Sequence, residues 1–242
     1  MSGIAVDIFV PFLIDHFFPQ TGMNMVKVLA SSGVSISRHS SQNTCGREAF
    51  VNGFWEDAKV IGERFMQSFS EEGLIVSPSA SSVAFVRSYY EHHFYNTGLH
   101  LIYKEFKKRF MEVSEFLLSK GLWAKLNPRL EERAVFHKDC FGGIPDGLGG
   151  DPEQLLERVQ GLELISMDAM NEGCGYQGLG PGQLPRVTEE ILKGWCHSAM
   201  DAGATVVIVV DDLCLFNLTS YIRKQKLPLK VMHMVDVLVS GS

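Results

Sequence analysis

The chain has 242 residues, of which 45% are hydrophobic and 21% are charged. This composition is enough to bury a sizeable core, and it excludes a chain that is disordered over most of its length. The net charge of −6 argues against a protein that mainly binds nucleic-acid phosphates, because such binding needs a basic surface. Five cysteines are too few and too scattered for a disulfide scaffold, and their odd number favours a reducing compartment.

The N-terminal stretch MSGIAVDIFVPFLIDHFF is apolar but does not have the pattern of a targeting signal. It lacks a basic leading region, and Asp7 and Asp15 interrupt its apolar residues. The most apolar run elsewhere, residues 204–210, is far too short to cross a bilayer. The sequence therefore predicts a cytoplasmic protein without a membrane span.

Short apolar runs rich in β-branched residues predict buried parallel strands. In chain order the runs cover residues 4–10, 34–37, 74–76, 134–137, 162–166, 205–210 and 230–235. Helical apolar stripes lie between them and consist of Phe54, Ala58, Ile61, Phe65 and Phe69, and of Phe106, Phe110, Val113 and Leu117. A further helix is predicted over residues 185–200, with Gly203 as its C-cap. Strands that alternate with helices predict an α/β protein with parallel sheets.

Two halves of the chain repeat the same landmarks. The tripeptide around Cys45 (Thr-Cys-Gly) returns around Cys174 as Gly-Cys-Gly. Phe12 and Ser82 flank the first tripeptide at nearly the spacing at which Cys140 and Cys214 flank the second. We therefore predict two pseudo-symmetric Rossmann-like units, residues 1–125 and 126–242, each a parallel sheet flanked by helices. The charged helix expected around residues 106–117 would link them.

Three cysteines of the second half, Cys140, Cys174 and Cys214, follow predicted strands or lie in a glycine-rich loop. Because loops at the carboxyl ends of parallel strands meet at one edge of a sheet, these thiols would converge there. Sulfur ligands suit iron–sulfur clusters, zinc or cuprous ion, and sulfurs around one such centre should lie within roughly 4–7 Å of one another. The alternative is that the three thiols are small hydrophobic side chains of a core.

Six segments resemble the CCG-domain, or cysteine-rich domain, family, and within it the lactate-utilization type of iron–sulfur oxidoreductase subunit. They are LIDHFFPQTG, TCGREAFVNGFWEDAKVIGERF, SPSASSVAFVRSYY, VFHKDC, GCGYQG and VMHMVDVL, and they cover nearly the whole chain. Members of the family carry two copies of a motif with one cysteine, then Cys-Cys-Gly, then one or two further cysteines. The resemblance implies that these thiolates bind iron–sulfur clusters, which pass electrons during oxidation of a hydroxy acid such as lactate or during disulfide reduction.

The first half departs from the family pattern at three of its cysteine positions, which read Phe12, Thr44 and Ser82. Only Cys45 remains, so this half cannot hold a cluster by cysteines alone. We expect the Phe12 ring to be buried in the volume that a cluster would have used, so that Phe12→Ala would cost roughly 3 kcal/mol. We expect Ser82 to hydrogen-bond or to cap the helix that follows it.

The second half keeps Cys140, Cys174 and Cys214, while Gly173 replaces one cysteine of the family motif. A four-iron cluster usually takes four thiolates, so three would hold a labile cluster with an open iron, a zinc ion with a water, or nothing. Cys45 would supply a fourth ligand if the two pseudo-symmetric loops meet.

The remaining polar candidates are weaker. His137 matches a histidine of the family segment and would either bind the metal or orient a loop, although a strand-end histidine bonded to backbone is the interpretation we favour. Surface or boundary positions are predicted for His92 and His93, and structural roles for Cys196 and His233. A solvated or helix-capping role is predicted for Asp211 and Asp212. The serines at 79, 81 and 82 lack a nucleophile motif and a placed acid and base.

The sequence thus predicts an electron-transfer or accessory iron–sulfur subunit of a hydroxy-acid (lactate/glycolate-type) oxidation complex. Such a chain would act with the other subunits of that complex rather than as a complete enzyme, and it would neither bind nucleic acid nor span a membrane. One alternative is a non-enzymatic scaffold that has lost its clusters. Another is a mononuclear zinc protein that uses Cys140, Cys174 and Cys214.

Overall fold

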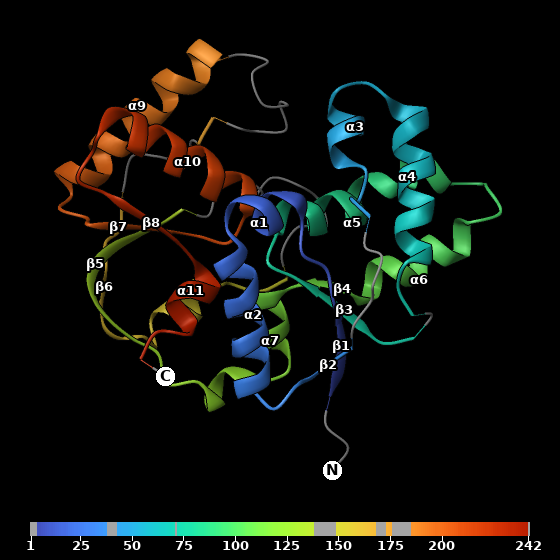
Figure 1. Ribbon diagram of the computed structural model, residues 1–242, viewed down its shortest axis with the longest axis horizontal. Helices are drawn as coiled ribbons and strands as arrows, with labels where there is room; N and C mark the ends of the chain where they lie inside the picture. Colours follow the sequence, from blue (N-terminus) through green and yellow to red (C-terminus); the bar gives the residue numbers. More distant parts are fainter. Residues whose placement is uncertain are drawn as a thin grey trace.

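The structure of the chain is a computed structural model that describes residues 4–37, 43–70, 72–137, 149–167, 173–175 and 185–241. These residues form two four-stranded parallel sheets (Figure 1). The first sheet comprises β1 (Ala5–Ile8), β2 (Ser35–Ser37), β3 (Leu74–Ser77) and β4 (Phe110–Glu112). The second comprises β5 (Arg129–His137), β6 (Gln160–Leu164), β7 (Val206–Val209) and β8 (Lys230–His233).

The two sheets have the same topology. Their strand orders are β2-β1-β3-β4 and β6-β5-β7-β8, so each strand of the first unit has a counterpart in the second. This arrangement confirms the predicted α/β fold of two pseudo-symmetric Rossmann-like units. In each sheet the order reverses between the two central strands, β1 and β3 or β5 and β7, and loops beyond the carboxyl ends of strands at such a switch point form ligand sites in open α/β sheets.

Helices cover and connect the sheets. In the first part of the chain they are α1 (Phe12–Phe17), α2 (Pro19–Ser31), α3 (Arg47–Val51), α4 (Trp55–Gln67), α5 (Ala80–Phe94), α6 (His100–Arg109) and α7 (Val113–Ser119), followed by the 3₁₀ helix η1 (Leu122–Lys125). In the second part they are α8 (Glu153–Leu156), α9 (Pro185–Asp201), α10 (Asp212–Gln225) and α11 (Met234–Leu238). Within the described residues, none of these helices combines the length and apolarity that a bilayer crossing needs.

The predicted charged helix around residues 106–117 is wrong as a single element. Helix α6 ends at Arg109, the next three residues form β4 beside β3, and α7 begins at Val113. The apolar spacing of these residues fits a helix. However, Phe110 is fully buried in a strand that pairs with β3, and Glu112 has extended backbone. The Glu112 side chain accepts hydrogen bonds from the N–H groups of Ser114 and Glu115, which makes it the N-cap of α7. Helix α6 ends before it, where Phe110 adopts extended backbone.

The two units share a central hydrophobic core. Helices α2, α7 and α11 lie between the sheets (Figure 1), and their apolar side chains join Val6 and Val76 of the first sheet to Ala134 and Val206 of the second. Each unit also has a core of its own on the other face of its sheet. In the first unit this core is largely aromatic, and in the second it surrounds Trp195 and three buried cysteines.

Candidate metal centre

One histidine and two cysteines converge at the carboxyl edge of the second sheet. His137 is the last residue of β5, Cys214 lies in the first turn of α10 after β7, and Cys174 belongs to the segment 173–175. One ligand atom from each lies within 4.8 Å of the others, and the two sulfurs are 3.5 Å apart. All three side chains are buried. Strands β5 and β7 are neighbours in the sheet, so parallel topology places these groups together.

Local hydrogen bonds fix the position of Cys214. Asp211 is the N-cap of α10, and its Oδ1 accepts from the backbone N–H groups of Leu213 at 2.9 Å and of Cys214 at 3.3 Å. A capped first turn is held in helical geometry, so the Cys214 side chain has a defined direction. The aspartate thereby takes the helix-capping role predicted for it.

The Cys174 segment is held between α9 and α10. The side-chain amide of Asn217 donates to the Cys174 carbonyl oxygen at 2.9 Å. Gly175 adopts a positive φ of 75°, and a Cβ there would lie 3.1 Å from the Cα of Thr188 on α9. Only glycine fits both conditions comfortably, which explains the Cys-Gly order of the motif. Gly46 repeats this arrangement in the first unit, with φ of 88° and a Cβ position 2.9 Å from the Ala58 carbonyl oxygen of α4.

The surroundings of the group are apolar on the side of α9. The ring of Trp195 meets His137 edge to face, with centroids 5.0 Å apart. Cys196, on the same helix, is fully buried, as predicted for a core residue. Burial, together with the nearby Cys174, raises the pKa of the Cys196 thiol to about 12, so it is protonated at neutral pH. Cys196 lies in the core cluster around Trp195 and outside the ligand group, which gives it a packing role.

The donor set matches a soft metal ion. Two thiols and one imidazole are ligands that zinc and related ions take in proteins. Around a tetrahedral ion with metal–sulfur bonds of about 2.3 Å, two sulfurs lie about 3.8 Å apart, close to the 3.5 Å between Cys174 and Cys214. In a four-iron cluster each thiolate binds a different iron, which sets the sulfurs farther apart, whereas in a two-iron cluster two protein ligands share one iron. The distance between the two sulfurs therefore fits a site in which both bind the same metal atom.

The structure brings together only part of the predicted site. The separation of the Cys174 and Cys214 sulfurs is slightly shorter than the range expected from sequence, and Cys140 lies outside the described residues. His137, for which a structural role was favoured, has its ring within reach of both thiols. Whether these residues bind a metal stays a prediction.

Cys45 does not belong to this group among the described residues and lies instead in the aromatic core of the first unit. The hydroxyl of Tyr90 donates to its carbonyl oxygen at 2.9 Å. Burial, and then the neighbouring Glu48 carboxylate, raise the pKa of its thiol to about 12. A thiol of that pKa is protonated at neutral pH. Its role as a fourth ligand stays a prediction.

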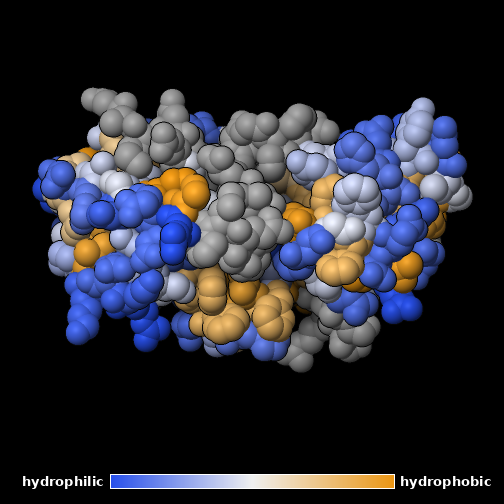
Figure 2. Space-filling model, turned by 90° about the horizontal axis from the view of Figure 1, so that it is seen from above, coloured by the Kyte–Doolittle hydropathy of each residue, from blue (hydrophilic) through white to orange (hydrophobic). Residues whose placement is uncertain are grey.

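Phe12 does not fill the space of a lost cluster, so the prediction of a buried ring is wrong. It is the first residue of α1, 58% exposed, and stacks on His16 with ring centroids 4.1 Å apart. Helix α1 turns this side chain outward, and Phe17 on the same helix is also exposed and meets Phe216 of α10. Apolar side chains gather in the middle of one face of the molecule (Figure 2).

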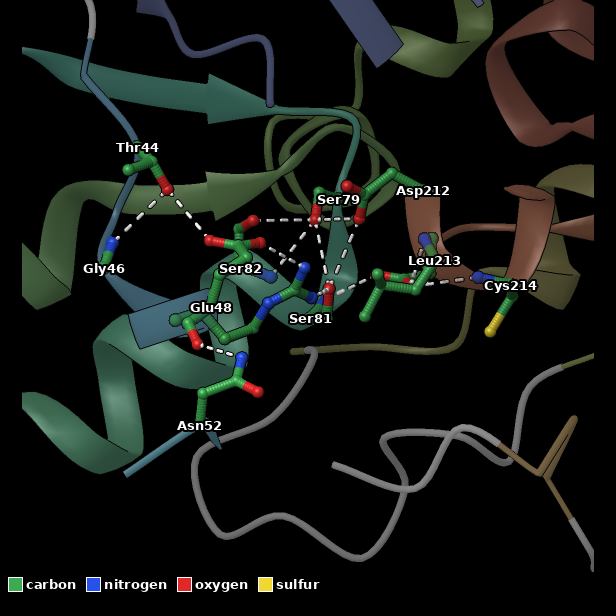
Figure 3. A network of polar contacts seen from close by, with 12 residues as sticks. Thr44, Gly46, Glu48, Asn52, Ser79, Ser81, Ser82, Asp212, Leu213 and Cys214 are labelled. Atoms are coloured by element: carbon green, nitrogen blue, oxygen red, sulfur yellow. Dashed lines mark hydrogen bonds and ion pairs between the residues drawn. The ribbon is translucent and has the colours of Figure 1, made fainter. Parts of the chain in front are cut away.

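A buried polar network joins the first unit to the second at this edge (Figure 3). Its members come from the starts of three helices, and they are Arg47, Ser79, Ser81, Ser82, Asp211 and Asp212. The guanidinium of Arg47 donates to the Ser81 hydroxyl. The Ser79 hydroxyl donates to Asp212 Oδ1 at 2.8 Å, and the Ser81 backbone N–H donates to Asp211 Oδ2 at 2.7 Å. The two units are therefore tied together by charges and hydrogen bonds as well as by the shared core.

The charges of this network compensate one another. Burial alone would lower the pKa of Arg47, but the carboxylates of Asp212 and Glu48 outweigh it and raise that pKa. Burial, and then the adjacent Asp211, raise the pKa of Asp212 to about 6. Both aspartates are 1% exposed, which contradicts the predicted solvated role. Ser79, rather than Ser82, caps α5, and the Ser82 backbone N–H donates to the Ser79 hydroxyl, so Ser82 hydrogen-bonds as predicted.

Sequence reasoning missed this network, although one signal pointed to it. Ser79 precedes Ser82 by the same number of residues as Asp211 precedes Cys214, so the repeat marks both as helix caps. The burial of Arg47 directly after the Cys-Gly pair has no signal of its own. His92 is exposed, as predicted, but His93 is buried, so its predicted surface or boundary position is wrong. His233 caps α11 by accepting from the Val235 N–H, a structural role as predicted.

Comparisons with known proteins agree with this architecture. Residues 6–82 and 134–219 both match the cysteine-rich domain (CCG) family. Lactate utilization protein A 2 of Bacillus cereus (strain AH820) is 29% identical and covers 98% of this chain and 99% of its own length. Lactate utilization protein A of Halalkalibacterium halodurans is 28% identical over 97% of this chain and 96% of its own.

Solved structures resemble the chain only weakly. A putative Asp/Glu racemase from Yersinia pestis has a TM-score of 0.36 and 8% identity, covering 98% of this chain and 96% of its own. Arylmalonate decarboxylase has a TM-score of 0.30 and 13% identity, covering 98% of this chain and 93% of its own.

Proposed function

Because this chain belongs to the cysteine-rich domain family, we propose that it is a metal-binding accessory subunit of a lactate- or glycolate-type hydroxy-acid oxidation complex. The relatives named lactate utilization protein A match it over nearly their full length, which supports this placement. The observation that carries the proposal is the group of His137, Cys174 and Cys214, whose ligand atoms lie within 4.8 Å of one another. The two units would divide at residues 1–125 and 126–242, and other subunits of the complex would be its partners.

The metal that the geometry favours is a single zinc ion. The short distance between the two sulfurs matches one tetrahedral ion, and an imidazole nitrogen completes a set of three ligands. Cys140, three residues after His137, is the fourth ligand that we propose. With three protein ligands a zinc ion keeps a position open for a water or a substrate oxygen, and with four it stabilises the fold.

The second candidate is an electron-transfer subunit with an iron–sulfur cluster at the same residues. The family match over residues 134–219 includes His137, Cys174 and Cys214, and this match favours a cluster in the second unit. A cluster held by Cys140, Cys174 and Cys214 would have one iron without a thiolate and would be labile. Cys45 would have to leave its aromatic core to complete such a site.

Anaerobic purification, followed by analysis for zinc, iron and inorganic sulfide, tests these candidates. We expect about one zinc per chain without sulfide and without visible absorbance. Iron with sulfide and a brown colour would instead support the cluster. If zinc, iron and sulfide are all absent after anaerobic purification, both metal proposals are rejected, and the remaining interpretation is a scaffold without a metal.

Single substitutions assign the metal to its ligands. Cys174→Ser and Cys214→Ser should each lower the bound metal strongly, because each removes one ligand of a small set. Cys196→Ala is the matched control, since Cys196 is a buried thiol of the same core that lies outside the ligand group. Retention of metal in both serine variants, with far-ultraviolet circular dichroism unchanged, would reject the site.

A further inference from the structure

A concave site lies in the first unit and shares no residue with the candidate metal centre. It is a cavity of about 330 Å³ between α3, α4 and α5, and its wall consists of Phe50, Trp55, Glu56, Lys59, His92 and His93. Ligand pockets in proteins begin at about this size, and they combine apolar walls with a few polar groups. The lining of this cavity has that composition.

Aromatic rings form two sides of the cavity. Phe50 of α3 meets Tyr89 at a centroid distance of 5.1 Å and His93 edge to face at 5.3 Å, so its ring is held in place by α5. Trp55, at the start of α4, also lines the cavity and is 64% exposed. A large indole kept at the rim of a hollow offers a flat face to a planar ligand.

One wall residue has an unsatisfied polar atom. His93 is only 7% exposed, and its Nε2 has no hydrogen-bond partner within the described part of the chain. Buried polar atoms are almost always hydrogen-bonded, so an exception in the wall of a cavity points to a group that the cavity receives. A hydrogen bond to a bound ligand would satisfy this nitrogen.

The charged side chains in the cavity wall are one cation, Lys59, and one carboxylate, Glu56, both on α4. Burial lowers the pKa of His93, and the neighbouring His92 and Lys59 lower it further, while the opposite effect of Glu56 is smaller. His93 is therefore neutral at pH 7, and Lys59 supplies a cation beside it. The Lys59 ammonium is the group of the wall that can pair with a negatively charged group of a ligand.

We propose that this cavity binds a small aromatic carboxylate. Its ring would lie against Phe50 and Trp55, and its carboxylate would face Lys59 and accept a hydrogen bond from His93 Nε2. The cavity is large enough for a one-ring ligand, and its aromatic walls favour a planar one. This site is independent of the proposed metal-dependent function, since no wall residue is a metal ligand.

Titration of the full-length chain with benzoate, followed by calorimetry and ligand-observed NMR, tests the proposal. Benzoate should bind at least about tenfold more tightly than benzyl alcohol, which lacks the charge, and than cyclohexanecarboxylate, which lacks the aromatic ring. Benzoate should also shift the imidazole resonances of His93. Equal affinity for the three compounds, or no binding of benzoate, would overturn the proposal.

Two variants locate the site. Lys59→Met and Trp55→Leu should each weaken benzoate binding about tenfold, the first by removing the cation and the second by removing the ring face. Lys104→Met is the matched control, because Lys104 is an exposed lysine of α6 outside the cavity. Both test residues are at least partly exposed, so folding should persist, and circular dichroism checks it. Unchanged benzoate affinity in folded Lys59→Met protein would overturn the proposal.

Discussion

The backbone N–H of Ser81 donates to Asp211 Oδ2 at 2.7 Å, so one carboxylate serves the starts of two helices in two different units. The other oxygen of Asp211 accepts from Leu213 and Cys214 at the start of α10. The same aspartate thus orients Cys214 toward the candidate metal centre and fastens α5 of the first unit beside it. Asp211 therefore couples the geometry of the metal centre to the contact between the units.

Substitution of Asp211 by alanine should lower the free energy of unfolding by about 2–3 kcal/mol, because it removes a helix cap and a buried acceptor. Asp211→Ser should lose less, about 1–2 kcal/mol, because serine restores the cap that Ser79 provides at the equivalent position of α5. Urea unfolding at pH 7 measures both. Asp57→Asn, at an exposed position of α4, is the control and should change stability little. Equal losses for alanine and serine would show that the cap does not contribute.

Glu112 should make the stability of the protein depend on pH. Burial, against the opposing hydrogen bonds from Ser114, raises the pKa of its carboxyl to about 8, and its Oε1 has no hydrogen-bond partner in the described residues. The folded state therefore keeps a proton that the unfolded chain releases above its ordinary pKa of 4.5. The free energy of unfolding should fall as pH rises between about 4.5 and about 8, by at most about 1.4 kcal/mol per pH unit.

Glu112→Gln isolates this contribution, because glutamine resembles the protonated carboxyl and does not titrate. Denaturant unfolding at several pH values should show a flatter profile for the variant than for the natural chain, with the larger stabilisation at pH 8. Glu105→Gln, at an exposed position of α6, should leave the profile of the natural chain unchanged. Parallel profiles for Glu112→Gln and the natural chain would contradict the raised pKa.

The repeat predicted more of the fold than local periodicity did. The near-constant spacing around Cys45 and Cys174 indicated two equivalent units, and both units have the same strand order. The apolar spacing of residues 106–117 predicted one helix, but Phe110 belongs to the short edge strand β4. A buried apolar residue at helical spacing fits a short strand as well as a helix, so spacing alone could not separate the two. The equivalent strand of the second unit, β8, was predicted at residues 230–235, so a strict use of the repeat would have indicated β4.

The candidate site could be predicted only where the topology determines position. Cys214 and His137 follow or end neighbouring strands, and this placement alone brings them to one edge. Sequence reasoning favoured a structural role for His137, because it cannot measure the distance from an imidazole to two thiols. The prediction that the Phe12 ring is buried was also wrong, because tertiary packing sets the direction in which α1 leaves β1. The burial of Arg47 among carboxylates depends on contacts between units and has no local pattern.

Comparison of two phenylalanines near the end of β1 tests the corrected position of α1. Phe12→Ala should lower the free energy of unfolding by less than about 1 kcal/mol, because most of its ring is already in water. Phe9→Ala should lower it by about 3–5 kcal/mol, because Phe9 is 3% exposed and its ring meets those of Phe65, Phe69 and Phe110. Urea unfolding of both variants gives the difference. A large loss for Phe12→Ala would restore the view that its ring fills a cavity.

The 3.5 Å between the sulfurs of Cys174 and Cys214 predicts how the metal-free protein responds to oxidation. Once the metal is removed with a chelator, diamide should join these two thiols in a disulfide, because they are already close and disulfide formation needs little further approach. Metal loading before oxidation should protect both, since bound thiolates are not available for exchange. Peptide mass spectrometry after alkylation of the remaining thiols identifies the bonded pair. Cys45 and Cys196 should stay reduced, because burial keeps their thiols protonated with pKa values of about 12. A disulfide that includes Cys45 or Cys196, or equal oxidation with and without metal, would contradict a metal centre built on Cys174 and Cys214.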